Sequence, residues 1–174
     1  WVEGYVSEVE VINNIPSLSS YSFSSSFVLR NETIILGFNS SDIEDSEELL
    51  SVTVNSRSPS GILSSDYFST IWYNSEYGHW ETNFTPLTTA ELGYYDILVM
   101  VNDTDGGSSG WNTFEESIHV ISNPPIITEY EVTDSDILRT ESIQISLGVY
   151  DVEDASQNMT ILIEYQSPSG NWSI

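Results

Sequence analysis

The stretch Ser122-Asn123-Pro124-Pro125 ends one segment of the chain and begins a second copy of that segment. When the sequence is displaced by 109 positions, residues 1–65 align with residues 110–174 without a gap. The identical positions are clustered: Val11-Ile12 on Val120-Ile121, Leu29-Arg30 on Leu138-Arg139, the trio Asp42, Glu44 and Asp45 on Asp151, Glu153 and Asp154, and Ser58-Pro59-Ser60-Gly61 on Ser167-Pro168-Ser169-Gly170. One register held over this length indicates a tandem repeat.

The 109-residue period divides the chain into three parts. Residues 1–12 match residues 110–121, so we interpret them as the terminal strand of a preceding repeat, or as a strand donated to a neighbouring molecule. Residues 13–121 form one complete repeat, and residues 122–174 form the first half of the next. A repeat of about 100 residues has the size of one sandwich domain and can bury a core of its own.

Short alternating segments predict strands. In Thr33–Asn39 the side chains of Ile34, Leu36 and Phe38 share one face, and the strongest alternation spans Tyr94–Asn102. Further strands are expected at 17–26, 50–55, 71–73, 80–84 and 114–121, with a turn at 58–61 and a single helical turn at 90–92. About seven short strands separated by turns predict a β-sandwich.

A series of short motifs runs through the end of the complete repeat. Phe84-Thr85-Pro86 is followed by Gly93 with Tyr95-Asp96, by Val99–Asp103 with Asp105-Gly106, and by Asn123-Pro124-Pro125. This series resembles the last strands and the linker of the Ig-like/PKD-like repeats of archaeal and bacterial cell-surface proteins. The resemblance implies an all-β fold of tandem Ig-like β-sandwich domains joined by a short Pro-rich linker, located at the cell surface outside the cell. Tyr95 also matches the tyrosine corner of such sandwiches by its spacing from Gly93, with Tyr94 as the alternative.

The composition is strongly acidic. Three Arg, no Lys and 27 acidic residues give a formal net charge of −24. Phosphate backbones and anionic lipids would be repelled, so neither nucleic acid nor membrane insertion of this segment is expected. The absence of Cys excludes disulfides and thiolate metal sites. No nucleophile or phosphate-binding motif accompanies His79 or His119, so we do not expect an enzyme.

The acidic turns are candidate calcium ligands. Calcium prefers six to eight oxygen ligands from carboxylates and carbonyls. In a sandwich, the turn after the first core strand and the turn between the last two strands can emerge at the same end. The alternative is that Asp and Gly simply form good turns. The candidate metal ligands are Asp42, Glu44, Asp45, Asp103, Asp105, Asp151, Glu153 and Asp154.

N-linked glycosylation is the predicted modification. Six of the twelve Asn residues lie in Asn-x-Ser/Thr sequons, more than the Ser and Thr content gives by chance. All six lie in or beside predicted turns and strand ends, where a glycan can reach solvent. They are Asn31, Asn39, Asn83, Asn102, Asn158 and Asn171.

The aromatic residues allow two functional interpretations. We expect most of Trp72, Trp80, Trp111 and Trp172 to fill the core or the contacts between repeats, which favours a structural segment of an extracellular filament, stalk, adhesin or sheath. Such a segment would be a semi-rigid glycosylated rod, with adjacent repeats or other copies of the chain as partners, and residues 1–12 as a candidate donor strand. The alternative is a calcium-dependent carbohydrate-binding or adhesion module, with sugars stacked on exposed Trp72 or Trp80.

Overall fold

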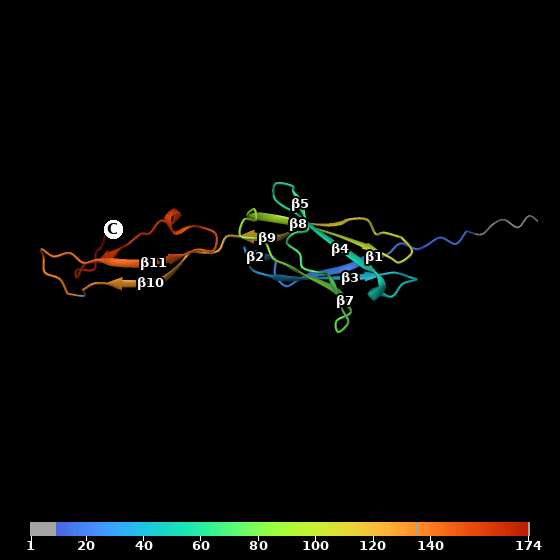
Figure 1. The fold of residues 1–174 in the computed structure, drawn as a ribbon, viewed down its shortest axis with the longest axis horizontal. Helices are drawn as coiled ribbons and strands as arrows, with labels where there is room; N and C mark the ends of the chain where they lie inside the picture. Colours follow the sequence, from blue (N-terminus) through green and yellow to red (C-terminus); the bar gives the residue numbers. More distant parts are fainter. Residues whose placement is uncertain (1–9, 135, 174) are drawn as a thin grey trace, which may run out of the picture. The chain divides into compact units, whose positions relative to one another are not determined.

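The computed structural model describes residues 10–134 and 136–173, and within these ranges the fold is all-β (Figure 1). The regular elements besides strands are two short 3-10 helices, η1 (Glu47–Leu49) and η2 (Ser156–Asn158). The chain forms two compact units: unit 1 ends at Ile121, and unit 2 begins at Ser122. In the described part of the chain, no helix has the length and apolar character needed to cross a bilayer.

Unit 1 contains a four-stranded antiparallel sheet. Its strands, in spatial order, are β1 (Ser17–Phe23), β3 (Ile34–Ser41), β7 (His79–Phe84) and β6 (Trp72–Asn74). Strand β1 lies at an edge of this sheet, within the segment 17–26 that was expected to be a strand. The strands expected at 71–73 and 80–84 form a hairpin, because β6 pairs with β7 across the turn that contains Gly78, whose φ is 68°.

A five-stranded sheet forms the other layer of unit 1. Its strands, in spatial order, are β2 (Phe27–Leu29), β9 (Asn112–Ile121), β8 (Gly93–Asn102), β4 (Ser51–Arg57) and β5 (Leu63–Ser64). Strand β2 runs parallel to β9, and the other neighbours are antiparallel. The chain passes several times from one sheet to the other, and the strand orders within the two sheets are those of an Ig-like β-sandwich. The prediction of an all-β sandwich is therefore confirmed.

The core of unit 1 lies between the two sheets. Leu36 and Phe38 from β3 are fully buried against Tyr95, Ile97 and Val99 from β8. These are the faces that the alternation in the sequence predicted. Burial of each such side chain stabilises the fold by roughly 1.5–3 kcal/mol relative to its exposure to water.

Unit 2 contains two short strand pairs. Strand β10 (Ile126–Val132) pairs with β11 (Ile145–Tyr150), and β12 (Tyr165–Gln166) pairs with β13 (Trp172–Ser173). The pairing of β10 with β11 has the register of β1 with β3, displaced by 109 residues. The register shift between Leu18 and Ser20 recurs between Ile127 and Glu129. The turn before β13 also recurs, because Gly61 and Gly170 both have a φ of 87°.

The structure differs from the predicted elements at three places. The helical turn expected at Ala90-Glu91-Leu92 is wrong: the segment is irregular, and the Ala90 amide closes a turn on the Leu87 carbonyl at 2.9 Å. Strand β2 was not predicted, because its three residues are too few to show an alternation. Of the closing strand predicted at 1–12, residues 1–9 lie outside the described ranges, and Glu10–Ile12 are not in a strand.

The tyrosine corner is formed by Tyr95, as its spacing from Gly93 predicted. The Tyr95 hydroxyl donates a hydrogen bond of 3.0 Å to the Glu91 carbonyl, four residues upstream, and the side chain is fully buried. Burial raises the pKa of this phenol well above its usual range. The competing candidate, Tyr94, is exposed and stacks on His119. The hydrogen bond fixes the crossover that joins the two sheets.

Replacing Tyr95 with Phe is expected to lower the free energy of unfolding of unit 1 by about 1 kcal/mol, because the Glu91 carbonyl loses its hydrogen-bond donor while the ring stays in place. Urea unfolding measures this loss. The matched control is Tyr94→Phe, which removes a hydroxyl from the neighbouring exposed ring and should change the unfolding free energy by less than about 0.5 kcal/mol. Equal effects of the two variants would contradict the role of the corner.

Candidate functional site

The acidic turn after β3 is organised by the side chain of Asp42. Its Oδ1 atom accepts hydrogen bonds from the backbone amides of Glu44 at 2.8 Å and Asp45 at 3.0 Å. The bonds from Asp45 and Glu44 hold the pKa of the Asp42 carboxyl below its usual value of 3.8. An Asp side chain that bonds to amides two and three residues ahead is a common way to close a turn. This carboxylate therefore has a structural role within the turn.

Glu44 anchors the chain that enters unit 1. The Asn14 side-chain amide donates to Glu44 Oε1 at 2.6 Å, and the Asn14 backbone amide lies 3.4 Å from the same oxygen. Asn14 lies two residues before Pro16, at the start of the repeat. This contact was not predicted from the sequence, although both residues recur 109 positions later, as Asn123 and Glu153.

The loop between β8 and β9 meets the acidic turn at the same end of unit 1. Asp45 Oδ2 accepts hydrogen bonds from the Thr104 amide at 3.0 Å and hydroxyl at 2.8 Å. Asp103 Oδ2 accepts one from the Asn13 side chain at 2.8 Å, and its Oδ1 accepts one from the Gly107 amide at 2.7 Å. The expectation that the two turns emerge at the same end is confirmed, and the chain that enters unit 1 lies beside them.

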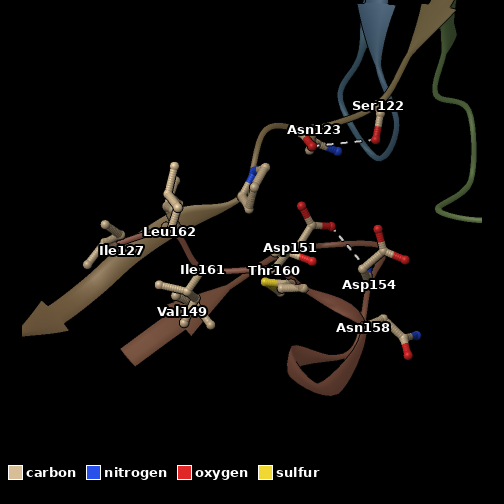
Figure 2. Close-up of a pocket in the computed structure, with 13 residues that line it drawn as sticks. Ser122, Asn123, Ile127, Val149, Asp151, Asp154, Asn158, Thr160, Ile161 and Leu162 are labelled. Carbon is tan, nitrogen blue, oxygen red and sulfur yellow. Dashed lines mark hydrogen bonds between the residues drawn. The ribbon is translucent and has the colours of Figure 1, made fainter. Parts of the chain in front are cut away.

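The same arrangement recurs in unit 2. Asp151 Oδ1 accepts from the amides of Glu153 at 2.8 Å and Asp154 at 3.0 Å, the latter drawn in Figure 2. The Asn123 backbone amide donates to both oxygens of Glu153 at 3.1 Å, and its side-chain amide donates to Oε1 at 3.2 Å. The Ser122 hydroxyl adds a hydrogen bond of 2.7 Å to Glu153. In each unit, an Asp side chain closes the acidic turn, and a Glu in that turn accepts hydrogen bonds from the Asn of the chain that enters the unit.

The candidate metal ligands do not converge on one point. Among residues 10–134 and 136–173, no three His, Cys, Asp or Glu side chains are grouped closely enough to hold a metal ion. Asp42, Asp45, Asp103 and Asp151 each accept hydrogen bonds from backbone amides, which is the use expected of Asp in a turn. Asp105 contributes its own amide to Asp103 at 2.9 Å. Calcium binding stays a prediction.

The sequons differ in exposure. Asn31, Asn158 and Asn171 are exposed, and Asn31 occupies the left-handed region at a φ of 62°. Asn39 and Asn102 are half-buried and lie in or at the end of strands, and Asn83 is half-buried on β7. The Asn39 side-chain amide also donates to the Ser20 hydroxyl at 2.7 Å. The first three sites are therefore the most accessible to a glycan.

The tryptophans are less buried than the sequence analysis expected. Trp80 packs against the core and donates a hydrogen bond of 3.2 Å to the Glu47 carbonyl. Trp72, Trp111 and Trp172 are exposed within their own units, so they do not fill a core, and their expected role in contacts between repeats stays a prediction. The reason is position, because Trp72 lies on the outward face of the short strand β6 and Trp111 lies in a loop.

Unit 2 has a hollow of about 370 Å³ beside the repeated acidic turn (Figure 2). Apolar side chains line one part of it, and the polar residues of the entering chain and turn line the other. The lining includes Ile127, Val149, Ile161 and Leu162, together with Ser122, Asn123, Asp151, Asp154 and Asn158. Figure 2 places the apolar group and the acidic turn on separate parts of this surface.

Comparison with known proteins gives no family. No protein-family model matches the chain, and no curated protein matches it. Among solved structures, the chain is similar to the titin domains Z1Z2 in complex with telethonin. The two share 13% sequence identity, with 93% of this chain and 80% of the other chain covered and a TM-score of 0.40. A likeness at this level carries no functional argument.

The low pKa of Asp42 predicts an acid-sensitive unit 1. A carboxyl whose pKa is lowered by folding stabilises the folded state above its usual pKa, and that stability is lost as the pH falls through the folded value. We therefore expect unit 1 to lose stability as the pH falls below about 4. In Asp42→Asn, which keeps the acceptor oxygen but cannot titrate, this loss should be smaller. Thermal unfolding between pH 7 and pH 2.5 measures it.

The control for this experiment is Asp105→Asn, which removes one negative charge from the same end of unit 1. It should leave the pH dependence of the wild type in place. If Asp105→Asn flattened the acid transition as much as Asp42→Asn, general charge repulsion would account for the transition instead of the Asp42 turn.

Proposed function

We propose that the chain is a structural segment of an extracellular array of Ig-like sandwiches, such as a surface filament, stalk, adhesin or sheath. One observation carries the proposal: the incoming Asn is bound to a Glu by the same contacts at the start of both units, at Asn14–Glu44 and Asn123–Glu153. A contact that recurs at each linker serves the linkage of one repeat to the next. The shared strand register at a spacing of 109 residues supports the tandem organisation.

The linker chemistry favours a semi-rigid rod. Strand β9 ends at Ile121, and the next two residues already bind Glu153. Pro124-Pro125 follows, and proline fixes its own φ and restricts the residue before it. Few backbone torsions are left free at this point, so we infer that successive repeats keep a limited range of mutual orientations.

The surface chemistry favours an extracellular location. The net charge of −24 keeps neighbouring polymers apart in solution. The exposed sequons at Asn31, Asn158 and Asn171 can carry glycans without disturbing a core. An acidic chain with accessible sequons suits a structural role outside the cell.

Calcium-dependent carbohydrate binding is the alternative function. Asp45 and Asp103 lie at the same end of unit 1 as the entering chain, and this favours the alternative because an added cation would neutralise adjacent acidic loops there. Calorimetry with a glycan panel, in calcium and in chelator, separates the two functions. Saturable sugar binding that is lost in Trp72→Ala would favour the binding module over the structural segment.

The structural proposal is tested on the native material. Negative-stain imaging is expected to show linear polymers or stalks at the cell surface, and glycopeptide mass spectrometry is expected to find glycans at Asn31 and Asn158 more often than at Asn39. A native material without extended assemblies, or a chain that carries no glycan and is found inside the cell, would overturn the proposal.

Removal of the Glu153 side chain is expected to increase the backbone motion of the linker residues that it binds. In Glu153→Ala, the backbone order parameters of Ser122 and Asn123 are expected to fall from about 0.85 toward 0.6, because both residues lose their acceptor. Nitrogen-15 relaxation measures this change. Glu131→Ala, which removes a carboxylate from β10 in the same unit, is the matched control and should leave the linker ordered. Unchanged order parameters in Glu153→Ala would refute the anchor.

A further inference from the structure

Unit 2 exposes the apolar positions that unit 1 buries. Unit 1 takes seven core residues from its first half, and all seven have apolar counterparts 109 positions later. The pairs are Val28 with Ile137, Ile34 with Ile143, Leu36 with Ile145, Phe38 with Leu147, Leu50 with Met159, Val52 with Ile161, and Val54 with Ile163. Each of these unit 1 residues is at most 7% exposed, whereas the five isoleucines among their unit 2 counterparts are 38–49% exposed. We call these seven unit 2 residues the open face.

Unit 1 shows which groups cover such a face. Its second half supplies the rest of the core, namely Phe84, Ala90, Tyr95, Ile97, Val99, Val101, Ile118 and Val120. Strand β8 also pairs with the backbone of β4, with Val52 opposite Val101 and Val54 opposite Val99. Within the described residues of unit 2, the counterpart of β4 is a strand only at Tyr165–Gln166. Among the residues that the structure describes, 160–164 are exposed and belong to no strand.

The hollow of unit 2 lies where this cover would pack. Ile127, Met159 and Ile161, which line it, correspond to Leu18, Leu50 and Val52, and these three pack in or against the core of unit 1. Figure 2 shows Ile127, Val149, Ile161 and Leu162 around the hollow. A group that packs on the open face must present apolar side chains on one face and backbone hydrogen-bonding groups along its edge. A polypeptide strand meets both needs, whereas a lipid or a sugar meets only one.

We propose that the open face binds a polypeptide segment with the pattern of residues 66–121, which completes the second sandwich as strands β6–β9 complete the first. The inference rests on the repeat organisation in the proposed function. Docked in this way, the segment pairs its counterpart of β8 with residues 160–166, and its counterpart of Val101, which lies opposite Val52 in unit 1, is placed at the hollow. The binding energy comes from burial of the open face and from the new ladder of backbone hydrogen bonds.

Charge predicts how this docking depends on salt. All three Arg of the chain, at positions 30, 57 and 139, lie outside 66–121, so the segment is purely acidic and meets an acidic unit. Their mutual repulsion is screened by salt. Docking is therefore expected to strengthen as ionic strength rises, the opposite of a contact formed by charge attraction.

The test is an extended chain in which a second copy of residues 66–121 follows Ile174. Amide hydrogen exchange of residues 143–149 and 160–166 is compared with that of the 174-residue chain. We expect exchange there to slow by at least about tenfold, because these amides gain partners and burial. The matched control carries Ile97→Asp and Val99→Asp in the added copy only. It should lose the protection, while unit 1 keeps its own in every variant.

Two outcomes would overturn the proposal. One is unchanged exchange at 160–166 in the extended chain. The other is protection of the same amides in the 174-residue chain as its concentration rises. That result would mean that a second copy of the chain occupies the open face, with its residues 1–12 as the candidate strand. Neither outcome bears on the imaging and glycan results, so a failure here is distinguishable from a failure of the surface-array function.

Discussion

Burial between the two sheets of unit 1 is the interaction on which the rest of the molecule depends. The core is drawn from both halves of the repeat: Leu36 and Phe38 come from the first half, and Tyr95, Ile97 and Val99 come from the second. Neither half has a partner for its apolar face without the other. This division explains why one sequence pattern gives a closed sandwich in unit 1 and an open face in unit 2.

The acidic residues of the loops act mainly as hydrogen-bond acceptors within the protein. Asp42 closes a turn, the turn presents Glu44, and Glu44 binds the incoming Asn14. Asp45 binds the loop between β8 and β9 at Thr104. A carboxylate accepts several amide hydrogen bonds at once and has no donor of its own when ionised, so it suits a position where backbone amides converge. The high acid content of these loops thus has a structural cause whether or not a cation binds there.

The sequence predicted the elements whose side chains alternate and failed where the chain is short or irregular. Strands β3 and β8 and the corner at Tyr95 follow from local patterns, because sheet burial imposes a period of two. Strand β2 and the irregular 90–92 segment depend on tertiary contacts, and three residues carry no period. The Asn14–Glu44 contact was not predicted, because a hydrogen bond between residues 30 positions apart leaves no local pattern. Its signal in the sequence is the joint recurrence of both residues at Asn123 and Glu153.

The way in which unit 1 buries its core distinguishes this repeat from the repeats of a solenoid. In a solenoid, each repeat buries its face on the next, so a partial repeat can still stack. Here the core of unit 1, including Val52 and Val54, is drawn from strands of both sheets of that unit. Burial in unit 1 is therefore completed within one repeat. Stability belongs to the closed sandwich, and the linker, held by its Asn and Glu, is left to determine how one sandwich is joined to the next.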